Sequence, residues 1–417
     1  MLLPGSKGWI LKYFNLVEKG QIDLHINHPK TADRDSFIHA NLGRTGIVFG
    51  YPSRLIFGKQ LDDSKWTIEE KLKVLLFESH LFVYQYQSTS SKFDSQSFSD
   101  ALFDFYGTYN VSTISNVFNF FLKESREDKI DSILEERVDI KLNLLDNKFW
   151  VNYLNNVFIY LDVILFNDFL KHRKKSTFFN YDEMAMNALN AITMASYSDG
   201  NIEQSERLMF NVFLASANLP DIQRAIAEER FKSGGDYRFF TDHIQSASLM
   251  KRFVLDLSVF VVFANHEAAY EEKKYLNELC QFLNFSEDVL NEAMVLTQQF
   301  MITNQDKIPF LQTTSSVEKV YSSLSRRWIK ILGRNRDKLA TELKQSKDLV
   351  FLIRKSATTD LTKEEKERVK TQFLDIVKSM PSLAIFMLPG GAFLLPIVLK
   401  VIPDLIPSAF RDNQVEK

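Results

Sequence analysis

The apolar segment from Met387 to Phe410 constrains the fold of this chain more than any other part of it. The 18 residues from Ser382 to Leu399 carry no charge. As a helix they would span about 27 Å, close to the hydrocarbon core of a bilayer at roughly 30 Å. The segment therefore lies in a membrane, in a protein core or against a partner.

Prolines interrupt this segment at a regular spacing, since Pro389, Pro396 and Pro403 recur every seven residues. On a helix they would share one face, and each would leave a carbonyl four residues earlier without its donor. Lipid cannot satisfy those carbonyls, so the pattern favours a packed, broken or re-entrant element over a lone lipid-exposed helix. The candidate membrane residues within 382–410 are Pro389, Pro396, Lys400, Pro403, Asp404 and Pro407.

A basic region precedes the apolar segment, with 16 basic and 8 acidic residues between Lys319 and Lys378. The whole chain has a net charge of −2, so DNA is not an expected partner and any electrostatic targeting is local. Apolar residues among the bases suit a helix that lies on anionic headgroups or on RNA, and a solvated face of a bundle helix explains them equally well. The candidate contacts are Arg326, Arg327, Lys330, Arg334 and Arg336.

Helix signals recur along the rest of the chain, whereas few segments alternate as strands do. Two capping boxes, Thr67 to Glu70 and Thr362 to Glu365, each precede apolar residues at helical spacing. These residues are Leu72, Leu75, Leu76 and Ser79 after the first box, and Val369, Phe373, Leu374 and Val377 after the second. We therefore predict an all-α fold of several helical bundles, ending in a proline-interrupted apolar helical segment.

Composition shifts divide the chain into three predicted domains. They are an aromatic-rich helical domain at 1–175, a duplicated helical domain at 176–305, and a basic domain at 313–417 that contains the membrane-type segment 382–410. A second apolar stretch, Phe149 to Leu170, contains six Asn or Asp residues, which indicates a buried amphipathic helix rather than a membrane span. We expect the single cysteine, Cys280, to be a small core residue.

The middle domain contains a duplication, because the segments Asp199–Leu219 and Asn265–Phe285 have equal length and matching apolar positions. Each copy predicts a loop followed by an amphipathic helix, and we expect the two copies to pack around a shared core.

The stretch MASYSDGNIEQSERLMFNVFLASANLP resembles the tellurite-resistance B-like domain, a small duplicated all-α module. The resemblance implies a divalent metal ion bound by Asp199, Glu203 and Glu206, since hard cations take several carboxylate oxygens. Asn265 and His266 replace the corresponding Asp-Gly in the second copy, which reduces the charge available for a site. The alternative is structural: Asp-Gly forms a turn, and acidic residues favour a helix N-terminus without any metal.

The stretch from Leu349 to Phe410 resembles the leucine-zipper and EF-hand-containing transmembrane (LETM) protein family. The residues that carry the resemblance are Leu361, Thr362, Pro389, Leu394, Leu395, Pro396, Lys400, Pro403 and Leu405 to Phe410. It implies an inner-membrane protein linked to cation and proton exchange and to ribosome binding. Ala392 stands where the family has a membrane glutamate, which weakens the transporter interpretation because a methyl group cannot exchange a cation for a proton.

Together these features resemble the LETM-related biofilm-associated proteins of Bacteroidota. We expect a non-enzymatic membrane-associated scaffold or sensor, because the sequence shows no catalytic motif and no cleaved signal peptide. The alternatives are a component of cation and proton exchange across the inner membrane, and a ribosome-binding membrane tether. The expected location is the cytoplasmic face of the inner membrane with a cytoplasmic body. Expected partners are inner-membrane lipids, the ribosome and a second copy through the apolar C-terminal segment.

Overall fold

The computed structural model describes residues 2–26, 33–87, 93–108, 125–138, 156–172, 181–264 without 201 and 203, 270–304, 341–356 without 342 and 344, and 361–378. Every regular element within these ranges is a helix, which confirms the predicted all-α fold. The first group of helices comprises α1 (Trp9–Glu18), α2 (Arg34–Gly43), η1 (Ile47–Phe49), α3 (Ile68–Gln87), α4 (Ser95–Thr108), α6 (Arg126–Val138) and α8 (Ile159–His172).

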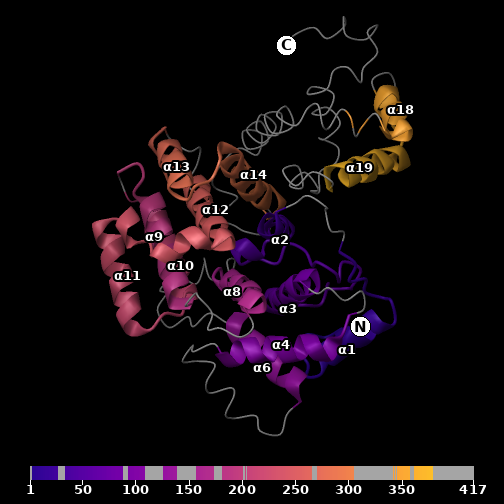
Figure 1. Cartoon of the computed structure of the whole chain (residues 1–417), viewed down its shortest axis with the longest axis horizontal. Coiled ribbons are helices and arrows are strands. Elements are labelled where there is room, and N and C mark those ends of the chain that lie inside the picture. Colours follow the sequence, from indigo (N-terminus) through magenta and orange to yellow (C-terminus); the bar gives the residue numbers. More distant parts are fainter. Residues whose placement is uncertain are drawn as a thin grey trace, which may run out of the picture.

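A second group contains the predicted duplication, and a third is a short helical pair near the end of the chain (Figure 1). The second comprises α9 (Tyr181–Ser196), α10 (Gln204–Ser216), α11 (Asp221–Ser233), η3 (Tyr237–Phe239), η4 (Asp242–Ser246), α12 (Ser248–Ala264), α13 (Tyr270–Phe282) and α14 (Glu287–Asn304). The third comprises α18 (Lys347–Ser356) and α19 (Lys363–Lys378).

Both predicted capping boxes are present. At the start of α3, the Thr67 N–H donates to Glu70 Oε2 at 2.8 Å, and the Glu70 N–H donates to Thr67 Oγ1 at 3.2 Å. The corresponding distances before α19 are 3.1 Å and 3.2 Å, between Thr362 and Glu365. Each box satisfies two backbone donors that have no partner within the helix, which explains why both helices begin where they do.

Aromatic side chains fill the core of the first group of helices. Phe77 of α3 lies at its centre, with ring centroids 5.2 Å from Trp9, 5.3 Å from Tyr13 and 5.6 Å from Phe98. All three pairs are edge-on, an arrangement that aromatic quadrupoles favour. The residues predicted to form the buried face of this helix, Leu72, Leu75, Leu76 and Ser79, are all buried.

Helix α8 is buried as predicted for its described part, but on nearly every side rather than on one face. Its acidic residue Asp162 is fully buried and accepts two hydrogen bonds from Arg137, from Nε at 2.8 Å and from Nη2 at 2.7 Å. Tyr106 donates a third at 3.1 Å. The polar residues of this helix thus include one that bonds to other side chains inside the protein. The prediction of burial is confirmed, and the prediction of an amphipathic helix with a solvated face is wrong.

Among the described helices, none combines the length and the hydropathy that a membrane span requires. The predicted membrane-type segment 382–410 lies outside the described residues.

The duplication extends beyond the segments in which the sequence shows it. Helices α9, α10 and α11 correspond to α12, α13 and α14, and Asn218 and Asn284 end the middle helix of each copy with φ values of 47° and 57°. The copies pack against each other mainly through α9 and α12, while α10 and α13 lie farther out. The two copies therefore share a core, as expected, and α9 and α12 form its centre, because they are buried on most sides whereas α13 buries only one face.

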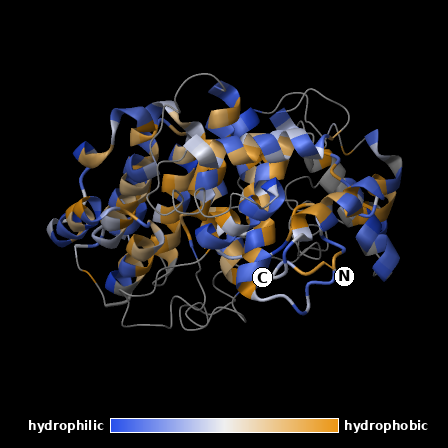
Figure 2. Cartoon of the chain, turned by 90° about the horizontal axis from the view of Figure 1, so that it is seen from below, coloured by the Kyte–Doolittle hydropathy of each residue, from blue (hydrophilic) through white to orange (hydrophobic). Residues whose placement is uncertain are grey.

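The first group of helices packs directly on the second copy of the repeat. Phe49 of η1 contacts Phe300 of α14 and Phe260 of α12, with ring centroids 4.5 Å and 5.2 Å apart. Helix α2 also lies against α12. Figure 2 shows apolar residues concentrated toward the middle of the helical body and polar residues toward its outside. Cys280, on α13, is buried as predicted.

Helices α18 and α19 form a hairpin around a small apolar core. Its buried side chains are Leu343, Leu349, Leu352, Ile353, Leu361 and Val369. Of the four residues predicted to line one face of α19, Val369 is buried, and the side chains of Phe373, Leu374 and Val377 are not among those described. Lys355 and Glu365 join the two helices through an ion pair of 2.7 Å.

Candidate functional site

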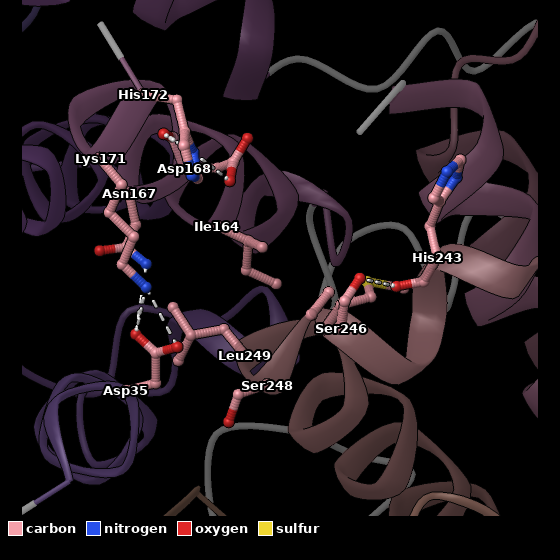
Figure 3. Close-up of a pocket in the computed structure, with 12 residues that line it drawn as sticks. Asp35, Ile164, Asn167, Asp168, Lys171, His172, His243, Ser246, Ser248 and Leu249 are labelled. Atoms are coloured by element: carbon pink, nitrogen blue, oxygen red, sulfur yellow. Dashed lines mark hydrogen bonds and ion pairs between the residues drawn. The ribbon is translucent and has the colours of Figure 1, made fainter. Parts of the chain in front are cut away.

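A cleft of about 340 Å³ lies where the end of α8 meets the junction of η4 and α12 (Figure 3). Small-molecule sites favour such positions between packed units. Its lining residues are Asp35, Ile164, Asn167, Asp168, Lys171, His172, His243, Ser246, Ala247, Ser248, Leu249 and Met250. The cleft therefore collects side chains from the start of α2, the last turns of α8 and the start of the second repeat copy.

One wall of the cleft is built by an ion pair between two helix ends. Lys171 Nζ lies 2.9 Å and 3.2 Å from the two carboxylate oxygens of Asp35, and Asn167 Nδ2 lies 3.4 Å from one of them. Asp35 is in the first turn of α2 and Lys171 is in the last turn of α8. Each charge therefore also complements the dipole of its own helix.

Two histidines stand on opposite sides of the cleft, each beside a carboxylate. His172 Nδ1 lies 3.1 Å from Asp168 Oδ1, and His243 Nδ1 lies 3.1 Å from Glu183 Oε1. Figure 3 shows the two imidazoles well separated across the opening, with Ile164 and Leu249 between the polar groups. Both imidazoles are partly exposed, with 39% and 57% of the side-chain surface accessible, so they can meet a ligand from solvent.

The chemistry of this cleft suits binding more than catalysis. Lys171 and both histidines are already engaged with carboxylates, and the hydroxyl of Ser246 donates to the His243 carbonyl at 2.9 Å. An activated nucleophile needs a base within hydrogen-bond reach of its own side chain. The described contacts provide no such pair at this cleft. Within the described part of the chain, no group of three or more His, Cys, Asp or Glu residues is placed to hold a metal ion.

The sequence did not point to this cleft. Asp35, Lys171 and His243 come from three distant segments, and each belongs locally to an ordinary helix end or short turn. The sequence shows only an acidic residue at the start of α2 and a basic residue at the end of α8. Both are expected from the helix dipole alone, so they do not indicate a binding site.

The predicted metal residues are only partly described. Asp199 is exposed in the turn that joins α9 to α10, and Gly200 beside it has a φ of 85°. Glu206 is buried in the first turn of α10, and Glu203 lies outside the described residues. The structure thus confirms the turn that the Asp-Gly pair indicates, and the metal site stays a prediction.

The other predicted site residues lie outside the described part of the chain. This applies to the basic contacts Arg326, Arg327, Lys330, Arg334 and Arg336, and to the membrane residues Pro389, Pro396, Lys400, Pro403, Asp404 and Pro407. Between these two sets, the structure describes the hairpin of α18 and α19. It contains the Leu-Thr pair with which the LETM resemblance begins: Leu361 is buried, and Thr362 caps α19.

The C-terminal end of the chain is similar to a known protein family. Residues 361–417 match the family model described as "LETM1-like, RBD". The C-terminal segment is therefore similar to a LETM1-like domain. A stretch of 122 residues is also 30% identical to the "LETM1 domain-containing protein YLH47, mitochondrial" of Saccharomyces cerevisiae. That match covers 28% of this chain and 24% of the yeast protein, so the chain spans about a quarter of the length of that relative.

The LETM1-like segment starts at Leu361, at the hairpin turn before α19. Its first helix is therefore part of a folded unit with α18, which lies just upstream of the matched residues. No solved structure matches this chain significantly.

Proposed function

We propose that this chain is a non-enzymatic, membrane-associated scaffold whose LETM1-like segment docks on the ribosome. The observation that carries the proposal is the match of residues 361–417 to a LETM1-like RBD, a ribosome-binding domain. The basic region that leads into it and overlaps its start, with eight more basic than acidic residues between Lys319 and Lys378, supplies charge for RNA or anionic lipid. The helical body would then be held at the membrane beside the ribosome, where it could act as a scaffold or a sensor.

The hairpin of α18 and α19 supports a docking role for this end of the chain. Phe351 on α18 exposes 63% of its surface, and the exposed side of α19 carries acidic and basic residues, including Lys363 and Arg368. An exposed aromatic side chain among charged residues is a common composition for an interface. The hairpin core is formed by other residues of the pair, so Phe351 is free to contact a partner.

Cation and proton exchange ranks below this proposal. Ala392 stands where the LETM family has a membrane glutamate, and a methyl group cannot exchange a cation for a proton. The association with surface growth, which the resemblance to biofilm-associated proteins implies, would follow from the scaffold role and is part of this proposal. The divalent metal site of the tellurite-resistance B-like region is likewise kept as a proposal.

Membrane attachment is tested by fractionation of the full chain and of a chain that ends at Met380. The full chain should stay with membranes washed in alkaline carbonate, and the shortened chain should be released. If both are released, the membrane part of the proposal is wrong.

Ribosome docking is tested separately, by co-sedimentation at low and high salt. Replacing Arg326, Arg327, Lys330, Arg334 and Arg336 by Gln should abolish salt-sensitive sedimentation, because each cation that pairs with a phosphate contributes to the salt dependence of binding. A charge-matched control replaces the exposed Lys7, Lys12, Lys19, Lys59 and Lys65 by Gln and should sediment as the unmodified chain does. An equal decrease in both variants would point to general charge attraction and contradict a specific dock.

A further inference from the structure

Two arginines near the end of α2, Arg44 and Arg54, are withdrawn from solvent to different degrees. Arg44 directly follows α2 and is only 7% exposed, and two of its guanidinium nitrogens, Nε and Nη2, are buried with no hydrogen-bond partner. Arg54 is partly buried close by. No carboxylate among the described residues forms an ion pair with either guanidinium. Native proteins rarely leave a buried charge in this state, because its desolvation is then uncompensated.

The backbone between the two arginines holds them near each other. The Ser53 N–H donates to the Thr45 carbonyl at 2.9 Å, and the Arg54 N–H lies 3.4 Å from the same carbonyl oxygen. The loop from Arg44 to Arg54 therefore closes on itself, with its two ends side by side. Burial lowers the pKa of Arg44 to about 9, and the nearby positive charge of Arg54 contributes a smaller part of this decrease.

This loop is rigidly built. Gly46 and Gly50 have φ values of 86° and 64°, and a Cβ at Gly46 would lie 2.2 Å from the Tyr51 carbonyl oxygen. Ser53 and Asn304, the last residue of α14, share hydrogen bonds of 3.0 Å and 3.3 Å between their side chains. The backbone that carries the two cations is thus fixed before any ligand arrives, which lowers the entropy that binding would otherwise lose.

We propose that Arg44 and Arg54 form the binding site of a small phosphate-bearing anion. Two guanidinium groups carry two positive charges, which match a phosphate dianion, and their planar donors pair well with phosphate oxygens. The burial of Arg44 restricts the ligand to a small group, such as inorganic phosphate or the phosphate of a metabolite. This site is separate from the LETM1-like segment and does not depend on the proposed ribosome docking.

The test is a titration of the full chain with inorganic phosphate in a phosphate-free buffer, followed by calorimetry and by thermal unfolding. Saturable binding should raise the melting temperature, which then climbs with the logarithm of phosphate concentration above the Kd. Sodium acetate and sodium chloride at equal ionic strength should produce a much smaller rise. An equal rise with all three salts would overturn the proposal.

Two variants identify the residues. Arg44→Met and Arg54→Met should each weaken phosphate binding at least tenfold, and Arg44→Met should not lower the melting temperature in phosphate-free buffer, because it removes an unpaired buried charge. Arg238→Met is the matched control, since Arg238 is 85% exposed and bound to Asp236, and it should bind phosphate as the unmodified chain does. If Arg44→Met destabilises the protein equally with and without phosphate, the arginine is structural and the proposal is wrong.

A phosphate group could come from a small soluble molecule or from a lipid headgroup, and a competition experiment with lipid vesicles distinguishes the two. Phosphatidylcholine vesicles with phosphatidic acid should not compete with inorganic phosphate, because a headgroup anchored in a bilayer cannot reach a side chain as buried as Arg44. Competition by these vesicles and not by pure phosphatidylcholine vesicles would overturn the assignment to a small soluble anion.

Discussion

His39 Nε2 lies 2.5 Å from Asp256 Oδ2, and this contact joins α2 to α12 across 217 residues of sequence. Both side chains are almost completely buried, with 7% and 1% of their surface exposed. Arg252 on the same face of α12 donates to Ser36 Oγ at 2.9 Å and lies 3.3 Å from Glu292. A chain of polar contacts therefore crosses the interface between the first group of helices and the second repeat copy.

Removal of either partner of this pair should destabilise the protein strongly. His39→Ala leaves the Asp256 carboxylate buried without its partner, and breaking a buried pair in this way typically costs about 3 to 5 kcal/mol. Urea unfolding at pH 7 measures the change. His25→Ala is the control: His25 is exposed, and its replacement should change the free energy of unfolding by less than about 0.5 kcal/mol. A decrease under about 1 kcal/mol for His39→Ala would show that the pair is not a major support of this interface.

The sequence predicted those parts of the fold that depend on local patterns. The capping boxes at Thr67 and Thr362 are signals confined to four residues, and the buried face of α3 follows from helical spacing. The duplication was detectable because a copied helix keeps its apolar positions. Even the burial of Cys280 follows from its place within an amphipathic pattern.

Features that depend on distant residues could not be predicted in this way. Nothing in the spacing of His39 and Asp256 indicates that α2 lies on α12, and buried polar residues of α8 resemble those of an amphipathic helix until Arg137 is known to face Asp162. The cleft of Figure 3 and the pair of Arg44 and Arg54 are likewise products of packing.

Acidification should destabilise the protein through His80. This histidine is fully buried among the rings of Phe105, Tyr106 and Phe166, and burial lowers its pKa to about 4, although the Asp162 charge acts in the opposite direction. A folded-state pKa below the unfolded value means that stability is complete above about pH 6.5 and is lost as the pH falls toward 4. The difference corresponds to about 3 kcal/mol.

The measurement compares urea unfolding at pH 7 and pH 4.5 for the unmodified chain and for His80→Gln. Glutamine does not titrate, so the variant should lose less stability over this interval than the unmodified chain, whatever its stability at pH 7. Parallel decreases in the two proteins would assign the acid sensitivity to other groups and contradict this prediction.

The equivalent asparagines of the two repeat copies should respond alike to substitution. Asn218 and Asn284 both adopt positive φ values at the end of a helix, a conformation that asparagine and glycine tolerate and that other residues adopt at a cost of roughly 1 kcal/mol. Asn218→Ala and Asn284→Ala should each destabilise by about that amount, whereas the glycine variants should be close to neutral. Thermal unfolding measures all four.

The cap of α19 offers a test within the LETM1-like segment. Thr362→Ala removes the hydroxyl that accepts from the Glu365 N–H, and such caps contribute about 1 kcal/mol. Because α18 and α19 form a small unit, the loss of the cap should lower the free energy of local unfolding of α19. Amide hydrogen exchange in α19 should therefore become about fivefold faster, while exchange in α12 stays unchanged. Thr362→Ser keeps the hydroxyl and should exchange at nearly the original rate. If the alanine variant exchanges as slowly as the unmodified chain, the prediction is wrong. The packing of α18 on α19 would then stabilise the helix without its cap.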